Sequence, residues 1–259
     1  MVMEHAHVRW AFINQHNWQA LWLEAGMGFL IAGAVGITYS FVLLRALPAS
    51  KSDGVVTKLT WEDARGLLHS RGYLLLCTAF FAFCAMLWIF YAWFPSFLYE
   101  RYQLSMTESG LTATVFVQVS CAIGVLIGST LADKLSSRFP IAALGILLSA
   151  PFGYLTFAAE TLEMARIYSV AYGFFSGFMV ANVFAACYDV IDRKNFGLAS
   201  GILNMVGGIS AAIMIYLAGA LKESVGFAGL LQWVAIACVI AAVMLWRYRP
   251  TIVNRSAGI

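Results

Sequence analysis

Uncharged polar side chains recur inside stretches of this sequence that are otherwise apolar. Amide and phenol groups donate and accept hydrogen bonds without a change of charge, so they suit the binding of a polar solute better than covalent chemistry. For each of them the alternative is an interhelical hydrogen bond that only holds the fold. The residues that we predict to line a binding cavity are Tyr91, Gln118, Tyr172, Asn182 and Asn204.

A compact cluster of charges directly follows one of the apolar stretches. It consists of Asp133, Lys134 and Arg138. Charged pairs at helix ends can hold one arrangement of helices and release another, so we predict that this cluster is a gate on the cytoplasmic side. The alternative is a solvated basic loop that only sets the topology of the chain.

The sequence gives little support for metal binding, disulfide bonding or proton transfer within the apolar stretches. The histidines lie outside the apolar stretches, and His5 with His7 is a weak indication of a metal site. The cysteines stand inside apolar stretches without paired spacing, as small core residues do. Acidic residues lie in loops or near the ends of the stretches, so no carboxylate is placed to carry a proton through the middle. We expect no enzyme activity, no metal and no cofactor.

The amino-acid composition indicates a protein embedded in a lipid bilayer. Of the 259 residues, 61% are hydrophobic and 11% are charged, whereas about 25% are charged in a soluble domain. Apolar runs longer than about 18 residues predict membrane-spanning helices, because only helices and closed barrels satisfy their backbone groups in lipid. Barrel strands would be shorter and would alternate. We therefore predict an all-α, polytopic membrane helix bundle with seven transmembrane helices, near residues 20–44, 73–98, 110–132, 140–159, 165–187, 197–221 and 227–248.

The basic residues are distributed unevenly between the two sides of this bundle. Most of the 16 Lys and Arg lie in 45–72, in the loops 133–139 and 188–196, and after 246. The positive-inside rule places these segments and the C-terminus in the cytoplasm, and the N-terminus outside. The sequence thus predicts a multi-pass protein of the cell membrane, with no nucleic acid as partner.

The only long polar segment between predicted spans is 45–72, and its second half has the pattern of a short helix. Thr60 can cap the helix, and acids follow in the first turn. Trp61, Ala64, Leu67 and Leu68 are expected to share one face, so we predict an amphipathic helix on the cytoplasmic membrane surface. The six later spans are joined by short loops and should form one compact bundle.

Glycines recur at a spacing of four residues within three of the predicted spans. Such pairs let helix backbones approach closely in lipid. We interpret them as sites of tight packing, and as candidates for an interface that moves. The pairs are Gly124 with Gly128, Gly173 with Gly177, and Gly197 with Gly201.

Several local patterns, in this order, resemble the C-terminal half of a major facilitator superfamily transporter together with the span before it. They are residues 18–22 (WQALW), 60–64 (TWEDA), 93–98 (WFPSFL), 102–110 (YQLSMTESG), 129–138 (STLADKLSSR) and 192–201 (DRKNFGLASG). The stretch 129–138 is similar to the cytoplasmic signature of the family. It differs from that signature at Ser129 and Ser136, where the family usually has glycine. At the start of the first span, Gln19 stands where the family usually has arginine.

The resemblance implies transmembrane transport of a small organic solute by alternating access, in which two six-helix bundles rock about a central site. It divides the chain into an extracytoplasmic segment 1–19, a helix 20–44 equivalent to span six, a central loop 45–72, a six-helix bundle 73–248 and a cytoplasmic tail 249–259. The expected partners are the lipid bilayer, a small-molecule substrate and a missing N-terminal six-helix half. The chain is then a fragment of a symporter or antiporter.

Two other interpretations remain open at this point. One is a membrane interaction or scaffold protein that transports nothing, and the other is a half-transporter completed by a separate N-terminal half.

Overall fold

The computed structural model describes residues 34–39, 41–42, 45, 60–135 and 137–248. The described residues fall into two units, one before residue 57 and one after it. Most of the predicted first span, 20–44, lies outside the described residues, so the structure does not test it. Within residues 60–248 every regular element is a helix, in agreement with the predicted all-α class.

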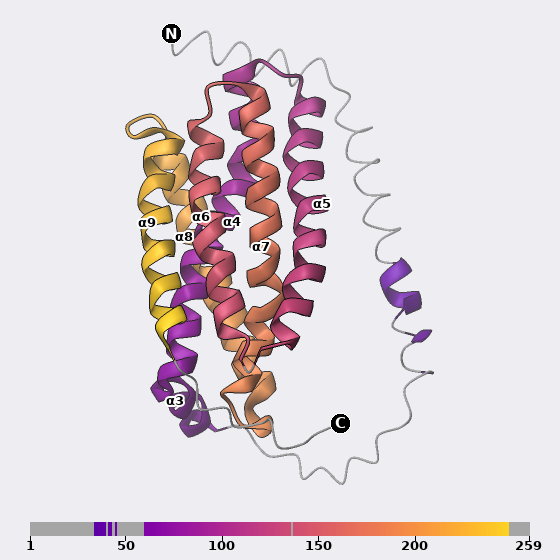
Figure 1. Cartoon of the computed structure of the whole chain (residues 1–259), viewed down its shortest axis with the longest axis vertical. Coiled ribbons are helices and arrows are strands. Elements are labelled where there is room, and N and C mark those ends of the chain that lie inside the picture. The colour runs from indigo at the N-terminus through magenta and orange to yellow at the C-terminus, as the bar shows by residue number, and fades with distance from the viewer. Residues whose placement is uncertain (1–33, 40, 43–44, 46–59, 136, 249–259) are drawn as a thin grey trace. The chain divides into compact units, whose positions relative to one another are not determined.

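Six helices of the second unit are long and apolar enough to cross a membrane. They are α4 (Arg71–Tyr102), α5 (Met106–Asp133), α6 (Phe139–Ala158), α7 (Leu162–Asp189), α8 (Phe196–Leu221) and α9 (Gly226–Arg247) (Figure 1). These helices coincide with the last six predicted spans. The short helices α3 (Trp61–His69) and η1 (Arg193–Asn195) precede α4 and α8. Both lie at the end of the bundle where α4 begins, which we call the α3 end.

The helix α3 starts at the predicted cap. The Thr60 hydroxyl accepts a hydrogen bond from the Asp63 backbone N–H at 3.4 Å, and the Asp63 carboxylate accepts one from the Thr60 N–H at 3.0 Å. The expected single apolar face is not formed, because Leu67 is buried against the bundle whereas Trp61 is 83% exposed. Leu68 is also exposed, so the apolar residues of α3 are divided between two faces.

Helices α5 and α7 pack through glycines along their length. A Cβ atom added at Gly128 would lie 2.8 Å from the Phe178 Cα, and one added at Gly124 would collide with the Phe174 backbone. Gly173 and Gly177 meet the backbone of α5 in the same way. Two of the three predicted glycine pairs are thus sites of close backbone approach.

Helices α4 and α8 are joined differently, by side chains that donate to backbone carbonyls of the facing helix. The Tyr73 hydroxyl donates to the Ala199 carbonyl at 2.7 Å, near the α3 end. The Ser210 hydroxyl donates to the Phe81 carbonyl at 2.7 Å, and the Trp93 indole N–H donates to the Ile215 carbonyl at 3.2 Å. Three bonds at separate levels therefore fix the two helices against each other.

The third glycine pair behaves otherwise than expected. Gly197 and Gly201 have no atom within 4 Å of an added Cβ, and Gly208 is equally open. Gly207, about 100° around α8 from Gly208, meets the Phe80 ring of α4 instead. The face of α8 that carries Gly201 and Gly208 is therefore open in the described part of the chain.

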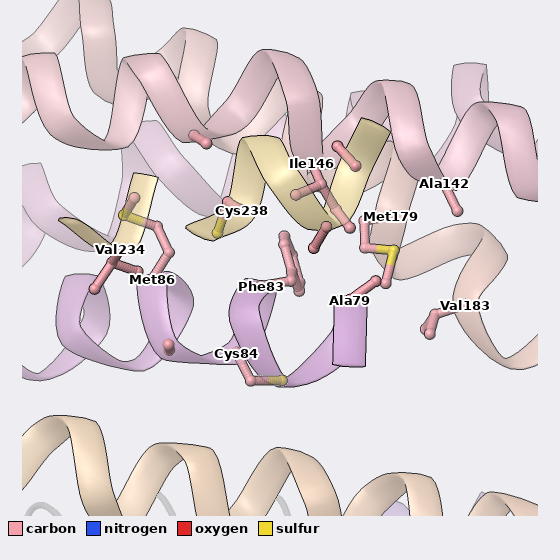
Figure 2. Close-up of a cluster of buried hydrophobic side chains, with 14 of the residues drawn as sticks. Ala79, Phe83, Cys84, Met86, Ala142, Ile146, Met179, Val183, Val234 and Cys238 are labelled. Atoms are coloured by element: carbon pink, nitrogen blue, oxygen red, sulfur yellow. The ribbon is translucent and has the colours of Figure 1, made fainter. Parts of the chain in front are cut away.

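The core lies between α4, α6, α7 and α9. Figure 2 shows Phe83 and Met86 of α4 among Cys238 of α9, Ile146 of α6 and Met179 of α7. All five side chains are almost fully buried. The core thus connects the α5–α7 pair, through α7, to the α4–α8 pair, through α4.

Candidate functional site

A small cavity lies at the seam between α4 and α5. Its volume is about 120 Å³, and polar and apolar side chains share its wall. It is lined by Phe90, Tyr91, Pro95, Ala113, Thr114 and Gln118. The structure thus brings together two of the five residues predicted to line a cavity, Tyr91 and Gln118, and adds Thr114 to its wall.

Pro95 contributes a further polar group to this seam. Proline lacks a backbone N–H, so the carbonyl of the residue four positions earlier in a helix has no intrahelical partner. That residue is Tyr91, which lines the same cavity. The cavity therefore offers a phenol, a hydroxyl and an amide, and next to them a backbone carbonyl able to accept a hydrogen bond.

Tyr172, the third candidate, lies behind the cavity rather than in its wall. Its side chain is fully buried, and its ring stacks on that of Phe90 with the centroids 4.3 Å apart. Its hydroxyl has electrostatic neighbours in Tyr91 of α4 and Cys121 of α5, and Ser176 lies close by on α7. The phenol is thus separated from the cavity by one aromatic ring.

Tyr172 and Ser176 share an unusual property among the described residues. Both hydroxyls are buried, and neither makes a hydrogen bond of ordinary geometry. Other hydroxyls in the spans donate to a carbonyl one turn earlier, as Ser120 and Thr156 do. A buried hydroxyl without a partner costs about 1–3 kcal/mol, and these two hydroxyls lie near each other on α7.

Asn182 makes the contacts of a fold-holding residue. Its amide nitrogen donates to the Gly128 carbonyl of α5 at 3.2 Å and to the Phe178 carbonyl of its own helix at 2.9 Å. The side chain is buried in the α5–α7 seam. These are the interhelical bonds that the sequence left open as an alternative.

Asn204 lies on the open face of α8, away from the cavity between α4 and α5. It is exposed, and Gly201 and Gly208 lie one turn before and after it. Its amide is therefore free to meet a ligand or another helix on that face. Tyr91 with Gln118, Tyr172, Asn182 and Asn204 thus occupy four different environments.

The predicted gate forms an ion-pair bridge at the α3 end. Arg138, at the start of α6, donates to Asp133 at the end of α5 at 3.1 Å and to Asp189 at the end of α7 at 3.3 Å. The Asp133 side chain is 66% exposed, whereas that of Asp189 is 12% exposed. Lys134 caps α5 and makes no ion pair with the described residues.

Asp189 was not among the predicted gate residues, although the sequence contains a signal for it. An acid at the C-terminal end of a helix is disfavoured by the helix dipole and needs a compensating cation. Asp189 is the last residue of α7, and Arg138 supplies that cation. One of its carboxylate oxygens is buried without a hydrogen-bond partner.

Comparison with known proteins defines the class to which this arrangement belongs. The sequence-family model of the Major Facilitator Superfamily matches residues 97–257, which is more than half of the chain. The chain therefore belongs to this superfamily of membrane transporters, as its resemblance indicated, and it is a multi-pass membrane protein rather than an enzyme.

Curated relatives of the chain are transporters of sugar acids by name. The D-galactonate transporter of Escherichia coli O6:H1 is 23% identical over 62% of this chain and 39% of the relative. The probable galactarate/D-glucarate transporter GudP of Escherichia coli K12 is 24% identical over 85% of this chain and 57% of the relative. The hexuronate transporter of Bacillus subtilis 168 is 26% identical over 82% of this chain and 52% of the relative. The chain spans about half the length of the curated relatives it matches.

Proposed function

We propose that this chain is the C-terminal half of a secondary transporter that moves small hydroxylated organic acids by alternating access. The family match and the names of the relatives support transport rather than a scaffolding role. The observation that carries the proposal at the level of residues is the cavity between α4 and α5, where Tyr91, Thr114 and Gln118 meet.

The proposed division of the chain follows the sequence. Residues 1–19 are extracytoplasmic, 20–44 form the last span of the first half, and 45–72 are the cytoplasmic central loop. Residues 73–248 form the second six-helix bundle, and 249–259 form a cytoplasmic tail. The coverage of the relatives, about half of their length, supports a partner half of similar size. That half is either part of the same polypeptide or encoded separately.

The polar groups of the site suit the hydroxyl groups of such a substrate better than its carboxylate. Tyr91, Thr114 and Gln118 line the cavity, and the Tyr172 and Ser176 hydroxyls lie behind it without partners. Lys and Arg are absent from the middle of the six spans. A carboxylate in a low-dielectric cavity needs a cation or several donors. We therefore place the cation that neutralises it in the partner half, together with any group that carries a coupled proton.

The Arg138 bridge is the proposed cytoplasmic gate. It connects the ends of α5 and α7 to the start of α6, so a change in its pairing would allow those ends to move apart. Asp133→Asn removes the exposed arm of the bridge and should change the transport rate without preventing membrane insertion. Transport at the wild-type rate by a normally inserted Asp133→Asn protein would contradict the gate.

The function is tested by uptake into cells that lack their own sugar-acid carriers. The chain is expressed together with a first half, and uptake of labelled galactarate, D-glucarate and D-galactonate is measured. Gln118→Ala should weaken apparent affinity about tenfold, because it removes a hydrogen-bonding group from the wall of the cavity. Gln232→Ala is the matched control, since Gln232 lies on α9, outside that cavity. Uptake with equal loss in both variants, or with none, would contradict the assignment of the cavity.

A further inference from the structure

The helix α3 presents a fixed outward face whose composition is unusual for a surface turned to water. Trp61 is 83% exposed and Leu68 is 46% exposed, and Arg65 is exposed as well. With 3.6 residues per turn, Arg65 and Leu68 lie about 40° and 20° from Trp61 around the helix axis. The three side chains therefore form one narrow stripe, which we call the α3 stripe.

The opposite side of α3 holds the helix against the bundle. Leu67 is 5% exposed and belongs to the main core cluster. The Asp63 carboxylate lies 3.6 Å from the ammonium group of Lys194, which belongs to η1 just before α8. These contacts hold α3 with the stripe turned away from the bundle.

The charge around the stripe is positive. Arg65 lies within it, and Arg71 is exposed one turn further on, where α4 begins. Asp63 is already paired with Lys194, so its charge does not offset that of Arg65. Glu62 is about 100° from Trp61 and lies at the edge of the stripe. An indole, an aliphatic side chain and a guanidinium together are the chemistry of a helix that lies at an anionic membrane surface.

The helix α3 directly precedes a membrane-spanning helix in the chain. Only Ser70 separates α3 from α4, which crosses the membrane. A helix with its side chains is about 10 Å across, so a stripe on α3 is within reach of the headgroups around the end of α4. Leu74, on the first turn of α4, is a further exposed apolar side chain near that end.

We propose that the α3 stripe rests on the bilayer surface, with Trp61 and Leu68 at the level of the headgroups and Arg65 paired with anionic phosphate groups. Through the Asp63–Lys194 pair, the same helix holds the segment before α8, so lipid charge would act on α8 as well as on α4. This proposal depends on the membrane setting of the chain and not on the identity of its substrate.

The proposal is tested with the chain reconstituted into vesicles of phosphatidylcholine alone, and of phosphatidylcholine and phosphatidylglycerol in equal parts. The emission of Trp61 is obtained as the difference between the wild type and Trp61→Phe, a conservative change at an exposed position. Lipids brominated near the headgroup report contact with the bilayer, and aqueous acrylamide reports contact with water. Near-identical circular dichroism of the two proteins establishes that both are folded.

In the expected result, the Trp61 component is blue-shifted and quenched by brominated lipid, more strongly in the anionic vesicles. Arg65→Gln should lower the ratio of lipid-quenched to unquenched Trp61 about fivefold in those vesicles, because one cation near an anionic surface has about that effect. Glu62→Gln, at the edge of the stripe, should not lower it. Quenching by acrylamide alone would overturn the proposal by placing Trp61 in water. Protection from both quenchers would overturn it by showing that protein covers the stripe.

Discussion

The α5–α7 seam and the α4–α8 seam hold the same bundle together by different means. Between α5 and α7 glycines bring the backbones into contact, and Asn182 adds an interhelical hydrogen bond. Between α4 and α8 the contacts include three side-chain hydrogen bonds to backbone carbonyls. The first seam depends on close fit over its whole length, whereas the second depends on bonds at separate points. The polar cavity lies at the boundary where α4 meets α5.

This difference matters because lipid gives no hydrophobic driving force between helices. Dispersion between backbones in contact falls steeply when the gap widens, so the α5–α7 pair should move as one body. Hydrogen bonds at separate levels can be lost one at a time. The two pairs are therefore expected to respond differently to substitution.

The largest effect should follow a substitution that separates α5 from α7. A Cβ at Gly177 would lie 2.6 Å from the Val125 backbone nitrogen, so Gly177→Val should destabilise the bundle by about 4 kcal/mol or more. Gly201→Val is the matched control, because no atom lies within 4 Å of its added Cβ. Thermal unfolding in detergent, followed by circular dichroism, measures both, and equal losses would remove the distinction between closed and open glycines.

A smaller effect is expected where the α5–α7 seam ends in charges. Asp189→Asn removes the buried partner of Arg138 and should cost about 2 kcal/mol, the value of a hydrogen bond to a charged group. Asp133→Asn should cost less than about 1 kcal/mol, because the Asp133 side chain is 66% exposed and exposed pairs contribute little. Denaturant unfolding of both variants provides the comparison, and the reverse order would mean that Asp133 is the main anchor of Arg138.

The α4–α8 seam should lose stability in separate steps. Tyr73→Phe and Ser210→Ala each remove one interhelical hydrogen bond, at an expected cost of about 1 kcal/mol. Because the bonds are about two turns apart, the double variant should show the sum of the two losses. A clearly larger combined loss in the same unfolding assay would show that this seam is as cooperative as the α5–α7 seam.

The smallest effect concerns the contact of α3 with the α4–α8 pair. The backbone and hydroxyl of Thr60 hold the pKa of Asp63 below its ordinary value, and Lys194 lowers it further. Because the pKa is lowered in the folded state, the carboxylate stabilises α3 at pH values above its ordinary pKa of about 4. This contribution is lost as the pH falls through the lower folded value.

The protection of the α3 amides, measured by hydrogen exchange and corrected for the intrinsic exchange rate at each pH, should therefore fall on acidification below about pH 4, before that of α4. Thr60→Ala removes the side-chain cap and should reduce this dependence on pH, whereas Thr78→Ala, whose hydroxyl bonds within α4, should leave it unchanged. An equal loss of protection in Thr60→Ala and the wild type would show that the cap does not hold α3.

The sequence predicted the six described spans and the Thr60 cap because these depend on local composition. It could not separate the roles of Gln118 and Asn182. Apolar residues occur on all sides of membrane helices, so their periodicity does not show which side faces the cavity. The same limit explains why Gly201 resembled Gly177 in the sequence although the structure leaves its surroundings open.

Two residues near the site, Asp189 and Ser176, could not be predicted from the sequence because their roles depend on tertiary contacts. Asp189 lies 51 positions after Arg138 in the chain, and only the packing of α6 on α7 brings the two together. Ser176 has the same residue type as the hydroxyls that bond within their own helices, so its lack of a hydrogen-bond partner is visible only in the folded structure.

The hydrogen bonds between α4 and α8 also affect how the sequence of α8 can diverge among related proteins. Tyr73 and Trp93 bind backbone carbonyls of α8, and every residue type presents the same carbonyl. Substitutions at Asn204 or Met205, on the outward side of α8, therefore leave these bonds unchanged. Related proteins can alter what α8 presents to a substrate or a partner helix while the helix stays in its place.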